Sequence, residues 1–318
     1  MKWDYNATDN VCYLTHSPKI MYINRYGYIY PDCKTYKTNP ICHIKDKNAV
    51  EIVKKYYTDD IPYHMITVEF NSACNANCFY CFQHDSINNS EYEYYDELLL
   101  FLINFDTHWI FFSGGEILVQ PKSIEFIYNY RLKCPDVWIH LKTNGNADTE
   151  RIKFITDCCN SVMVSFNGFN SAIYSTIMGI DVDKTVAFCK SIRDINKTHL
   201  GLKFLNSPIA LVDVPDFLEW ALALNPQCIA VQTAYNYDLT VEGSSSRIGS
   251  TFDGLNIKYW KPVIQRVSKR IDKILHNNYD IINSNGNYLT ADREFLSLLN
   301  LSEINTQQFR TDGVYRIE

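Results

Sequence analysis

The sequence lacks the features that would place it in a membrane or on a nucleic acid. No apolar run approaches the roughly 20 residues that a membrane-spanning helix needs. Lys and Arg (30) are outnumbered by Asp and Glu (36), which leaves a formal net charge of -6. Nucleic-acid binding needs clustered basic residues, so we expect neither a membrane nor a nucleic-acid partner. No secretory signal opens the chain, and we therefore expect a cytoplasmic protein.

The eleven cysteines need an explanation other than disulfides, because the cytosol keeps thiols reduced. The remaining explanations are metal binding, catalysis and burial as small apolar side chains. Apolar residues make up 46% of the chain and charged residues 21%, which is typical of a globular protein with a substantial core.

Residues 64–235 alternate short apolar strands with helical segments. The candidate strands are 65–70, 109–112, 137–142, 162–166, 202–205 and 229–232. Such alternation is typical of a parallel sheet covered by helices. The predicted fold class is α/β, with an open, partial (β/α)6 barrel.

The flanking segments have a different character. Residues 1–63 contain a predicted β-hairpin, with strands at 20–23 and 28–30, followed by a short helix. Residues 236–318 begin with a polar loop and continue as a helical extension. The apolar residues of the extension recur at helical spacing and are expected to cover the sheet: Trp260, Val263, Ile264, Val267, Ile271, Ile274 and Leu275. The sequence therefore predicts three parts, 1–63, 64–235 and 236–318.

Three cysteines lie within eight residues directly after the first predicted strand, at Cys74, Cys78 and Cys81. Clustered thiolates of this kind hold iron–sulfur clusters. Zinc is the alternative, with His84 as a fourth ligand. The triad follows the carboxyl end of a strand, where barrel folds place their active sites, and this position favours the iron–sulfur interpretation.

The C-x3-C-x2-C spacing, with Tyr80 before the last cysteine, resembles the signature of the radical S-adenosylmethionine (SAM) superfamily. The segment Gly114-Gly115-Glu116, at the end of the second strand, is similar to the Gly-Gly-Glu of that family. The resemblance implies a [4Fe–4S] cluster on the three cysteines, with one iron open to SAM. It also implies reductive cleavage of SAM to a 5′-deoxyadenosyl radical, which abstracts hydrogen from a substrate.

The resemblance further implies a set of cofactor-binding residues: Gly114, Gly115, Glu116, Tyr80, Thr143, Asn144 and Ser165. The Gly-Gly-Glu segment would receive the amino group of SAM, because a carboxylate pairs with an ammonium group. The tyrosine would pack near the adenine, and the serine would contact the ribose. The threonine or the asparagine after the third strand would line the pocket.

The amino-terminal hairpin runs into Pro31 and Cys33 and looks like the auxiliary, twitch-like motif of the same family. Together with Cys12 and Cys42, Cys33 could hold a second iron–sulfur cluster. A zinc site completed by one of the nearby histidines, His16 or His43, is a second possibility. In the third interpretation the hairpin holds no metal and caps the barrel.

The fourth strand, with Ser165 and the Asn167-Gly168 that follows it, resembles the branch of the family that includes peptide-modifying maturases. A ribosomal peptide or a small natural-product intermediate is therefore the expected substrate. An electron donor such as flavodoxin or ferredoxin is the expected partner. The alternative function is that of a zinc-stabilised binding module without redox chemistry.

Overall fold

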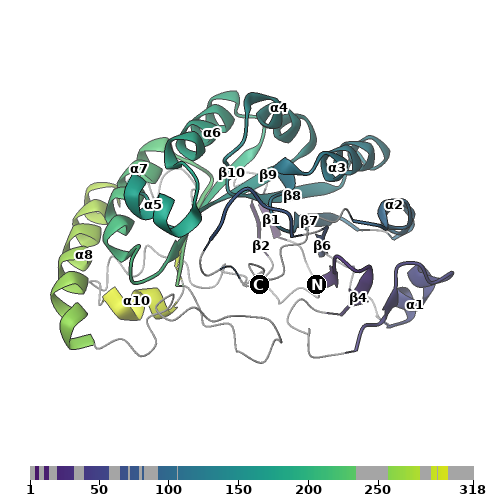
Figure 1. Ribbon diagram of the computed structural model, residues 1–318, viewed down its shortest axis with the longest axis horizontal. Helices are drawn as coiled ribbons and strands as arrows, with labels where there is room; N and C mark the ends of the chain where they lie inside the picture. Colours follow the sequence, from purple (N-terminus) through teal and green to yellow (C-terminus); the bar gives the residue numbers. More distant parts are fainter. Residues whose placement is uncertain are drawn as a thin grey trace.

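The structure is a computed structural model (Figure 1). It describes residues 4–6, 11–13, 20–31, 39–56, 65–70, 72–78, 81, 92–105, 107–233, 257–279, 288–291 and 293–299. Five features singled out in the sequence lie outside these residues: His16, Cys33, Tyr80, His84 and the polar loop 242–249.

A ten-stranded sheet forms the centre of the molecule, in the order β12-β11-β10-β9-β8-β7-β6-β3-β4-β5. The six predicted strands are present as β6 (Met65–Glu69), β7 (Trp109–Ser113), β8 (Trp138–Thr143), β9 (Ser161–Phe166), β10 (His199–Asn206) and β11 (Cys228–Thr233). They pair in parallel and in sequence order. The predicted α/β class and open barrel are therefore confirmed.

The parallel sheet extends by one strand on each side of the six predicted ones. Strand β3 (Ile20–Ile23) pairs in parallel with β6, and β12 (Tyr288–Ala291) pairs in parallel with β11. The predicted hairpin is formed by β3 and the antiparallel β4 (Tyr28–Tyr30), and β5 (Cys42–His43) adds to it. The hairpin therefore continues the sheet of the barrel. Strands β1 (Asp4–Asn6) and β2 (Val11–Tyr13) form a separate pair.

Helices line the outer side of the sheet in an arc (Figure 1). The arc consists of α2 (Tyr95–Asn104), α3 (Pro121–Lys133), α4 (Thr149–Cys158), α5 (Ser171–Met178), α6 (Val182–Ile195), α7 (Val214–Leu224) and α8 (Ile257–Asn277). Helices α1 (Ala49–Tyr56) and α10 (Arg293–Leu299) lie nearer the chain ends. Of the helices that the structure describes, none is long and apolar enough to cross a membrane.

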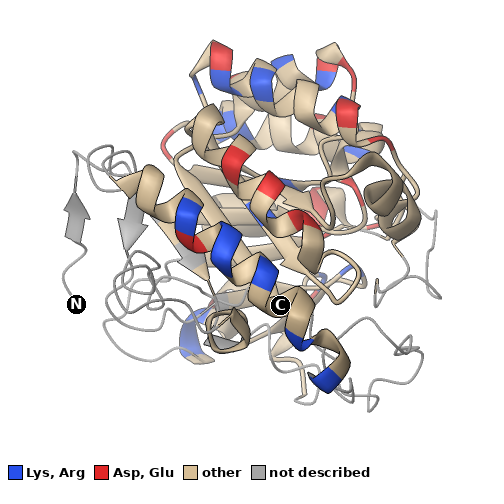
Figure 2. Ribbon diagram, turned by 90° about the vertical axis from the view of Figure 1, so that its left-hand side faces the viewer, with Lys and Arg blue, Asp and Glu red and all other residues tan. Residues whose placement is uncertain are grey.

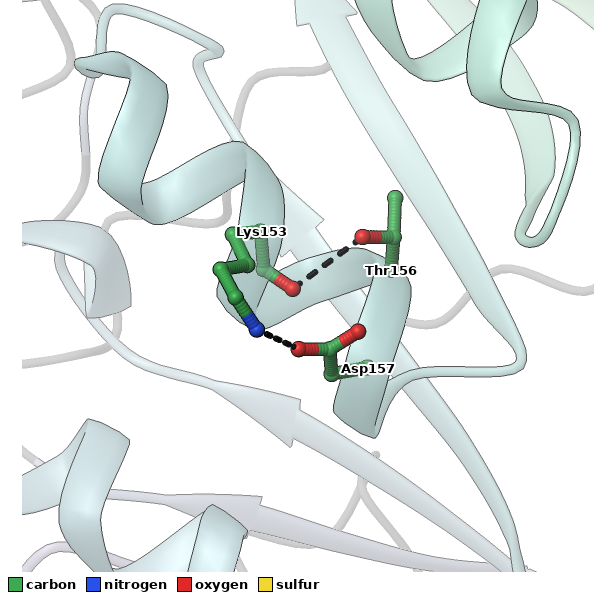
Figure 3. A network of polar contacts seen from close by, with 3 residues as sticks. All are labelled: Lys153, Thr156 and Asp157. Carbon is green, nitrogen blue, oxygen red and sulfur yellow. Dashed lines mark hydrogen bonds and ion pairs between the residues drawn. The ribbon is translucent and has the colours of Figure 1, made fainter.

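Local sequence explains where several of these helices begin and end. The Asp148 carboxylate accepts a hydrogen bond from the Arg151 amide at the start of α4, which satisfies a backbone donor of the first turn. Further along α4, Lys153 pairs with Asp157, and the Thr156 hydroxyl donates to the Lys153 carbonyl (Figure 3). Helix α6 ends where Asn196 adopts a left-handed conformation.

The strands of the barrel present alternate residues to the helices and to the interior. Phe112 on β7 makes an edge-to-face contact with Phe126 of α3, and Leu141 and Val162 continue this outer layer across β8 and β9. Because side chains alternate along a strand, the residues beside these ones face the barrel interior. The inner face carries polar groups, among them His140 and Lys142.

Helix α8 covers the sheet as its apolar spacing predicted. Ile264, Val267, Ile271, Ile274 and Leu275 are buried, and Trp260 and Val263 are partly buried against the same core. The opposite side of the helix carries the exposed basic residues Lys258, Lys261, Arg266, Lys269, Arg270 and Lys273 (Figure 2). This helix is therefore amphipathic, with a basic outer face.

His140, on the inner face of β8, is partly buried and has a hydrogen-bond partner. Its Nδ1 lies 2.7 Å from the Ser161 hydroxyl. Burial and, to a smaller extent, the neighbouring Lys142 lower its pKa to about 4. The folded state therefore holds a neutral ring, whereas the unfolded chain protonates near pH 6.5.

We expect this histidine to make the protein sensitive to acid. Its depressed pKa contributes stability above pH 6.5 that is lost as the pH falls toward 4, about 2 kcal/mol between pH 7 and pH 5. His140→Gln should flatten the pH dependence of the unfolding free energy, measured by urea titration at both pH values. The exposed His108 provides the matched control, and His108→Gln should keep the wild-type slope. Equal slopes in both variants would contradict the prediction.

Candidate functional site

The predicted site residues meet at the carboxyl ends of three adjacent parallel strands. The cysteine loop, which we define as residues 72–78 with Cys81, follows β6. The Gly114-Gly115-Glu116 segment follows β7, and Thr143, Asn144 and Gly145 follow the apolar part of β8. Strand β7 pairs with both β6 and β8. Three motifs that lie far apart in the sequence therefore share one edge of the sheet, as barrel active sites do.

Gly115 lies directly against the backbone of the cysteine loop. A Cβ atom at this position would lie 2.1 Å from the Ala73 carbonyl oxygen and 2.5 Å from the Ser72 carbonyl carbon. Only a residue without a side chain fits at that approach. The same Ala73 carbonyl accepts hydrogen bonds from the Glu116 amide (2.7 Å) and from Gln120 Nε2 (3.1 Å). The first glycine, Gly114, has φ of 139°, a conformation that favours glycine.

The Glu116 carboxylate is buried and accepts three hydrogen bonds from within the chain. Its Oε1 accepts from the Thr143 hydroxyl (2.8 Å) and the Leu118 amide (3.1 Å), and its Oε2 accepts from the Asn144 amide (2.7 Å). Burial raises the pKa of this carboxyl group, while the three hydrogen bonds lower it. The side chain thus ties the end of β7 to the end of β8. The expected contact with the SAM amino group stays a prediction.

Three alternate residues fix the cysteine loop to the barrel. Ala73 accepts from the Gly-Gly-Glu segment, as described above. Asn75 accepts from Asn144 Nδ2 (2.7 Å) and donates to the Asn146 carbonyl (2.9 Å). The Asn77 amide donates to the carbonyl of Met178, at the end of α5 (2.8 Å). Asn75 and Asn77 could not be singled out from the sequence, since an asparagine in a loop has no distinctive pattern.

Cys74 lies between the attachment points Ala73 and Asn75, and Cys78 and Cys81 follow the attachment point Asn77. Cys74 and Cys78 are partly buried against the core, and the Cys81 amide donates to the Cys78 carbonyl (3.0 Å). Burial raises the pKa of Cys74 to about 11 and that of Cys78 further, and repulsion among the three thiolates adds to both shifts. Cys74 and Cys78 therefore favour the protonated thiol form, and a metal that binds them must displace protons.

The cysteine loop fits an iron–sulfur cluster in the kind and mutual proximity of its donors. Three sulfur atoms on one loop interact electrostatically, and thiolates are the usual ligands of such clusters. Within the described ranges, no three His, Cys, Asp or Glu side chains are already arranged as a metal site. The assignment of the cluster to Cys74, Cys78 and Cys81 therefore stays a prediction.

Two other predicted residues lie in the interior near this edge. The Ser165 hydroxyl, on the inner face of β9, is buried and has no hydrogen-bond partner among the described residues, so it can still bond a ligand. Thr143 is buried beneath Glu116. The predicted adenine contact, Tyr80, lies outside the described residues.

The structure adds two lysines that the sequence analysis did not assign to the site. The side chains of Lys142, on β8, and Lys203, on β10, lie near each other, and Lys142 also interacts electrostatically with Cys81 and Cys78. A lysine within an otherwise apolar strand could have indicated this position. It is a weak signal, because strands commonly carry one polar face.

The second metal site has no support in the described part of the chain. Cys42 is buried on β5, Cys33 lies outside the described residues, and only the backbone of Cys12 is described. His43 uses both ring nitrogens: Nε2 bonds the Tyr26 carbonyl (2.8 Å), and Nδ1 accepts from the Lys45 amide (3.1 Å). That histidine is therefore engaged in holding the hairpin turn.

Comparison with known proteins agrees with this fold and arrangement. Residues 68–206 match the Radical SAM superfamily. The chain is 31% identical over 163 residues to a probable GTP 3′,8-cyclase of Methanocaldococcus jannaschii, an alignment that covers 49% of this chain and 54% of that protein.

Two structures of SuiB from Streptococcus suis resemble the fold. The complex with precursor peptide SuiA gives a TM-score of 0.53 at 10% identity and covers 76% of this chain and 55% of that one. The SAM complex gives 0.52 at 10% identity, with coverages of 71% and 51%. The chain spans about half the length of these relatives.

Fold and site together define an α/β-barrel enzyme with its functional edge at the carboxyl ends of the strands. The residues that match the radical SAM superfamily, 68–206, include the cysteine triad and the Gly-Gly-Glu segment. The family that this segment matches implies SAM and a [4Fe–4S] cluster as cofactors.

Replacing the glycine that contacts the cysteine loop should disrupt the loop. We expect Gly115→Ala to lose at least half of its reconstituted iron, because the added methyl group collides with the Ala73 carbonyl. Gly201→Ala is the matched control, since its methyl group would meet only the flexible end of Met163. Iron content and far-UV circular dichroism are measured on both. Wild-type iron in Gly115→Ala would contradict the proposed packing constraint.

Removing the charge of Glu116 should destabilise the protein even without SAM. In Glu116→Gln the new amide group faces backbone donors, and about 1–3 kcal/mol of unfolding free energy should be lost. The exposed Glu125 of α3 offers the control, and Glu125→Gln should stay within about 0.5 kcal/mol of wild type. Urea unfolding measures both. An unchanged stability of Glu116→Gln would show that the three hydrogen bonds contribute little.

Proposed function

We propose that this chain is a radical SAM enzyme that cleaves SAM reductively at a [4Fe–4S] cluster held by Cys74, Cys78 and Cys81. The observation that carries the proposal is the attachment of the cysteine loop to the Gly-Gly-Glu segment and to the end of β8. This arrangement holds three thiols beside two further strand ends. A loop held at three points retains a defined geometry while its side chains bind a ligand.

The cofactors would supply the chemistry, and the chain would bind and orient them. The bound cofactors would supply one-electron reductive cleavage of SAM to methionine and a 5′-deoxyadenosyl radical, which is able to abstract hydrogen from a substrate. In the proposal, Cys74, Cys78 and Cys81 ligate iron. Glu116 maintains the relative positions of Ala73 and Asn144.

The remaining predicted cofactor-binding residues keep their proposed roles. Gly114 and Gly115 allow the backbone to approach the SAM methionyl group, and Ser165 offers an unused hydroxyl in the barrel interior. Thr143 and Asn144 support the pocket wall, and Tyr80 is assigned to the adenine on the resemblance alone. In the proposed division of the chain, residues 64–235 carry catalysis, and the parts 1–63 and 236–318 flank it.

A peptide is the first candidate substrate. It is supported by the expected relation to peptide-modifying enzymes and by the similarity in fold to SuiB, which has been solved with a precursor peptide. A small natural-product intermediate is the other substrate that the sequence predicts. The M. jannaschii relative favours a second class, a purine nucleotide, since its name describes a cyclase that acts on GTP. In either case a one-electron donor such as flavodoxin or ferredoxin is the proposed partner.

The central test is formation of 5′-deoxyadenosine. Protein reconstituted anaerobically with iron and sulfide should hold about four irons per chain, the content of one [4Fe–4S] cluster, and should form deoxyadenosine from SAM with dithionite. Cys78→Ala should abolish this activity, because the cluster loses a ligand. Cys189→Ala is the control, since Cys189 is buried in α6 and is not one of the three proposed cluster ligands. A colourless protein that binds only zinc would instead establish the alternative of a zinc-stabilised module.

The substrate class can be separated in the same assay. Deoxyadenosine formation is compared with no addition, with GTP, and with a short peptide encoded next to the gene. A substrate that donates hydrogen should increase the rate of deoxyadenosine formation. Mass spectrometry should then show that the substrate has lost a hydrogen or gained a new bond. Stimulation by GTP alone would overturn the peptide proposal and leave the enzyme class intact.

A further inference from the structure

Gln120 stands at the N-cap of α3, yet its side chain does not cap the helix. Its backbone is fixed on both sides, because its amide donates to the Ile117 carbonyl (2.9 Å) and its carbonyl accepts from the Ile124 amide (3.1 Å). Ser, Thr, Asp and Asn are the usual residues at an N-cap, since their side chains bond the first turn. Natural proteins break such local rules mainly at functional sites. The glutamine therefore calls for an explanation outside its own helix.

The side chain of Gln120 reaches the cysteine loop instead. Its Nε2 donates to the Ala73 carbonyl (3.1 Å), and its Oε1 accepts from the Ser123 hydroxyl (2.9 Å). Turning the amide by 180° would set its oxygen against the Ala73 carbonyl oxygen, so the two partners define which end of the amide faces the loop. Gln120 and Ser123 are both buried, and an unpaired polar atom on either would be costly.

The hydrogen bonds of this network run in one direction. The Ser123 hydroxyl has a single proton, which it donates to Gln120, and the Tyr95 hydroxyl therefore donates its own proton to Ser123 Oγ (2.8 Å). The Tyr95 ring packs against Phe70 and Phe126, with 5.6 Å between ring centroids in each pair. Hydrogen bonds in series polarise and strengthen one another.

This network joins both ends of the segment that carries the three cysteines. Ala73 lies before the cysteines, and Tyr95, the first residue of α2, lies after them. Gln120 and Ser123 belong to the start of α3, shortly after the Gly-Gly-Glu segment. The Ala73 carbonyl also accepts from the Glu116 amide. The start of α3 thus holds the cysteine segment at both ends, next to the Gly-Gly-Glu segment.

We propose that Gln120 is a positioning residue of the SAM site, which holds the cysteine loop against the Gly-Gly-Glu segment through Ala73. Ser123 acts through Gln120 by fixing the orientation of its amide. The inference rests on the proposed function, in which SAM contacts both the cluster on the loop and the Gly-Gly-Glu segment. A ligand that bridges two segments binds most tightly when their relative position is set in advance. Loss of the network should therefore weaken SAM binding.

The test measures the SAM affinity of the anaerobically reconstituted protein by isothermal titration calorimetry, without a reductant, so that SAM is not consumed. Gln120→Met keeps the length of the side chain and removes both hydrogen bonds. We expect the dissociation constant for SAM to rise about tenfold, because two buried hydrogen bonds are lost. Ser123→Ala should raise it about threefold, since the Gln120 amide loses the donor that orients it.

The double variant separates positioning from a general loss of stability. Adding Ser123→Ala to Gln120→Met should not raise the dissociation constant further, because the serine acts through the glutamine. Additive effects would contradict this part of the inference. Gln265→Met is the matched control on the exposed side of α8 and should keep the wild-type affinity. Iron content and urea unfolding show whether each variant retains the cluster and the fold.

The outcomes separate this inference from the proposed function. Full iron content and the wild-type SAM affinity in both single variants overturn the positioning role and leave the proposed enzyme class intact. If Gln120→Met folds without holding iron, Ser123→Ala decides, and a wild-type affinity in that variant overturns the inference. A wild-type protein that assembles no cluster overturns the proposed function and, with it, the role of Gln120.

Discussion

The arrangement of the site depends on the hydrogen bonds around Glu116 and Ala73. The Glu116 side chain accepts from the ends of β7 and β8, while its own amide holds the Ala73 carbonyl of the cysteine loop. One residue therefore connects three consecutive strand ends. The carboxylate is buried and its donors are fixed. Loss of the carboxylate would therefore leave buried donors without an acceptor, which is costly.

The chemistry of the loop follows from this rigid surrounding. Buried, closely spaced thiols resist ionisation, as the raised pKa of Cys74 and Cys78 shows. A metal centre compensates by replacing protons, and a nearby cation compensates by opposing the negative charge that results. The loop supplies the donors, and Lys142 on β8 interacts electrostatically with Cys78 and Cys81.

The sequence indicated much of the fold, because strand and helix periodicity is a local property. The six strands from Met65 to Thr233 and the apolar face of α8 are where the pattern placed them. The pairing of β3 with β6 and of β12 with β11 was not predictable, since a pattern of residues does not specify which strand lies beside it. For the site, the motifs located Cys74 and Glu116. They did not reveal the hydrogen bonds made by Glu116, nor the encounter of Lys142 with Lys203, because both depend on strands brought together by folding.

The last attachment of the cysteine loop has a consequence for how the protein matures. Asn77 is held by the carbonyl of Met178, which is synthesised long after the cysteines, and Asn75 is held by residues that follow β8. A nascent chain that has emerged only as far as Cys81 therefore presents its thiols on an unsupported loop. Domains generally fold as units once their parts are available. Under the proposed function, iron delivery to this loop would therefore follow synthesis of the fourth barrel strand and of α5.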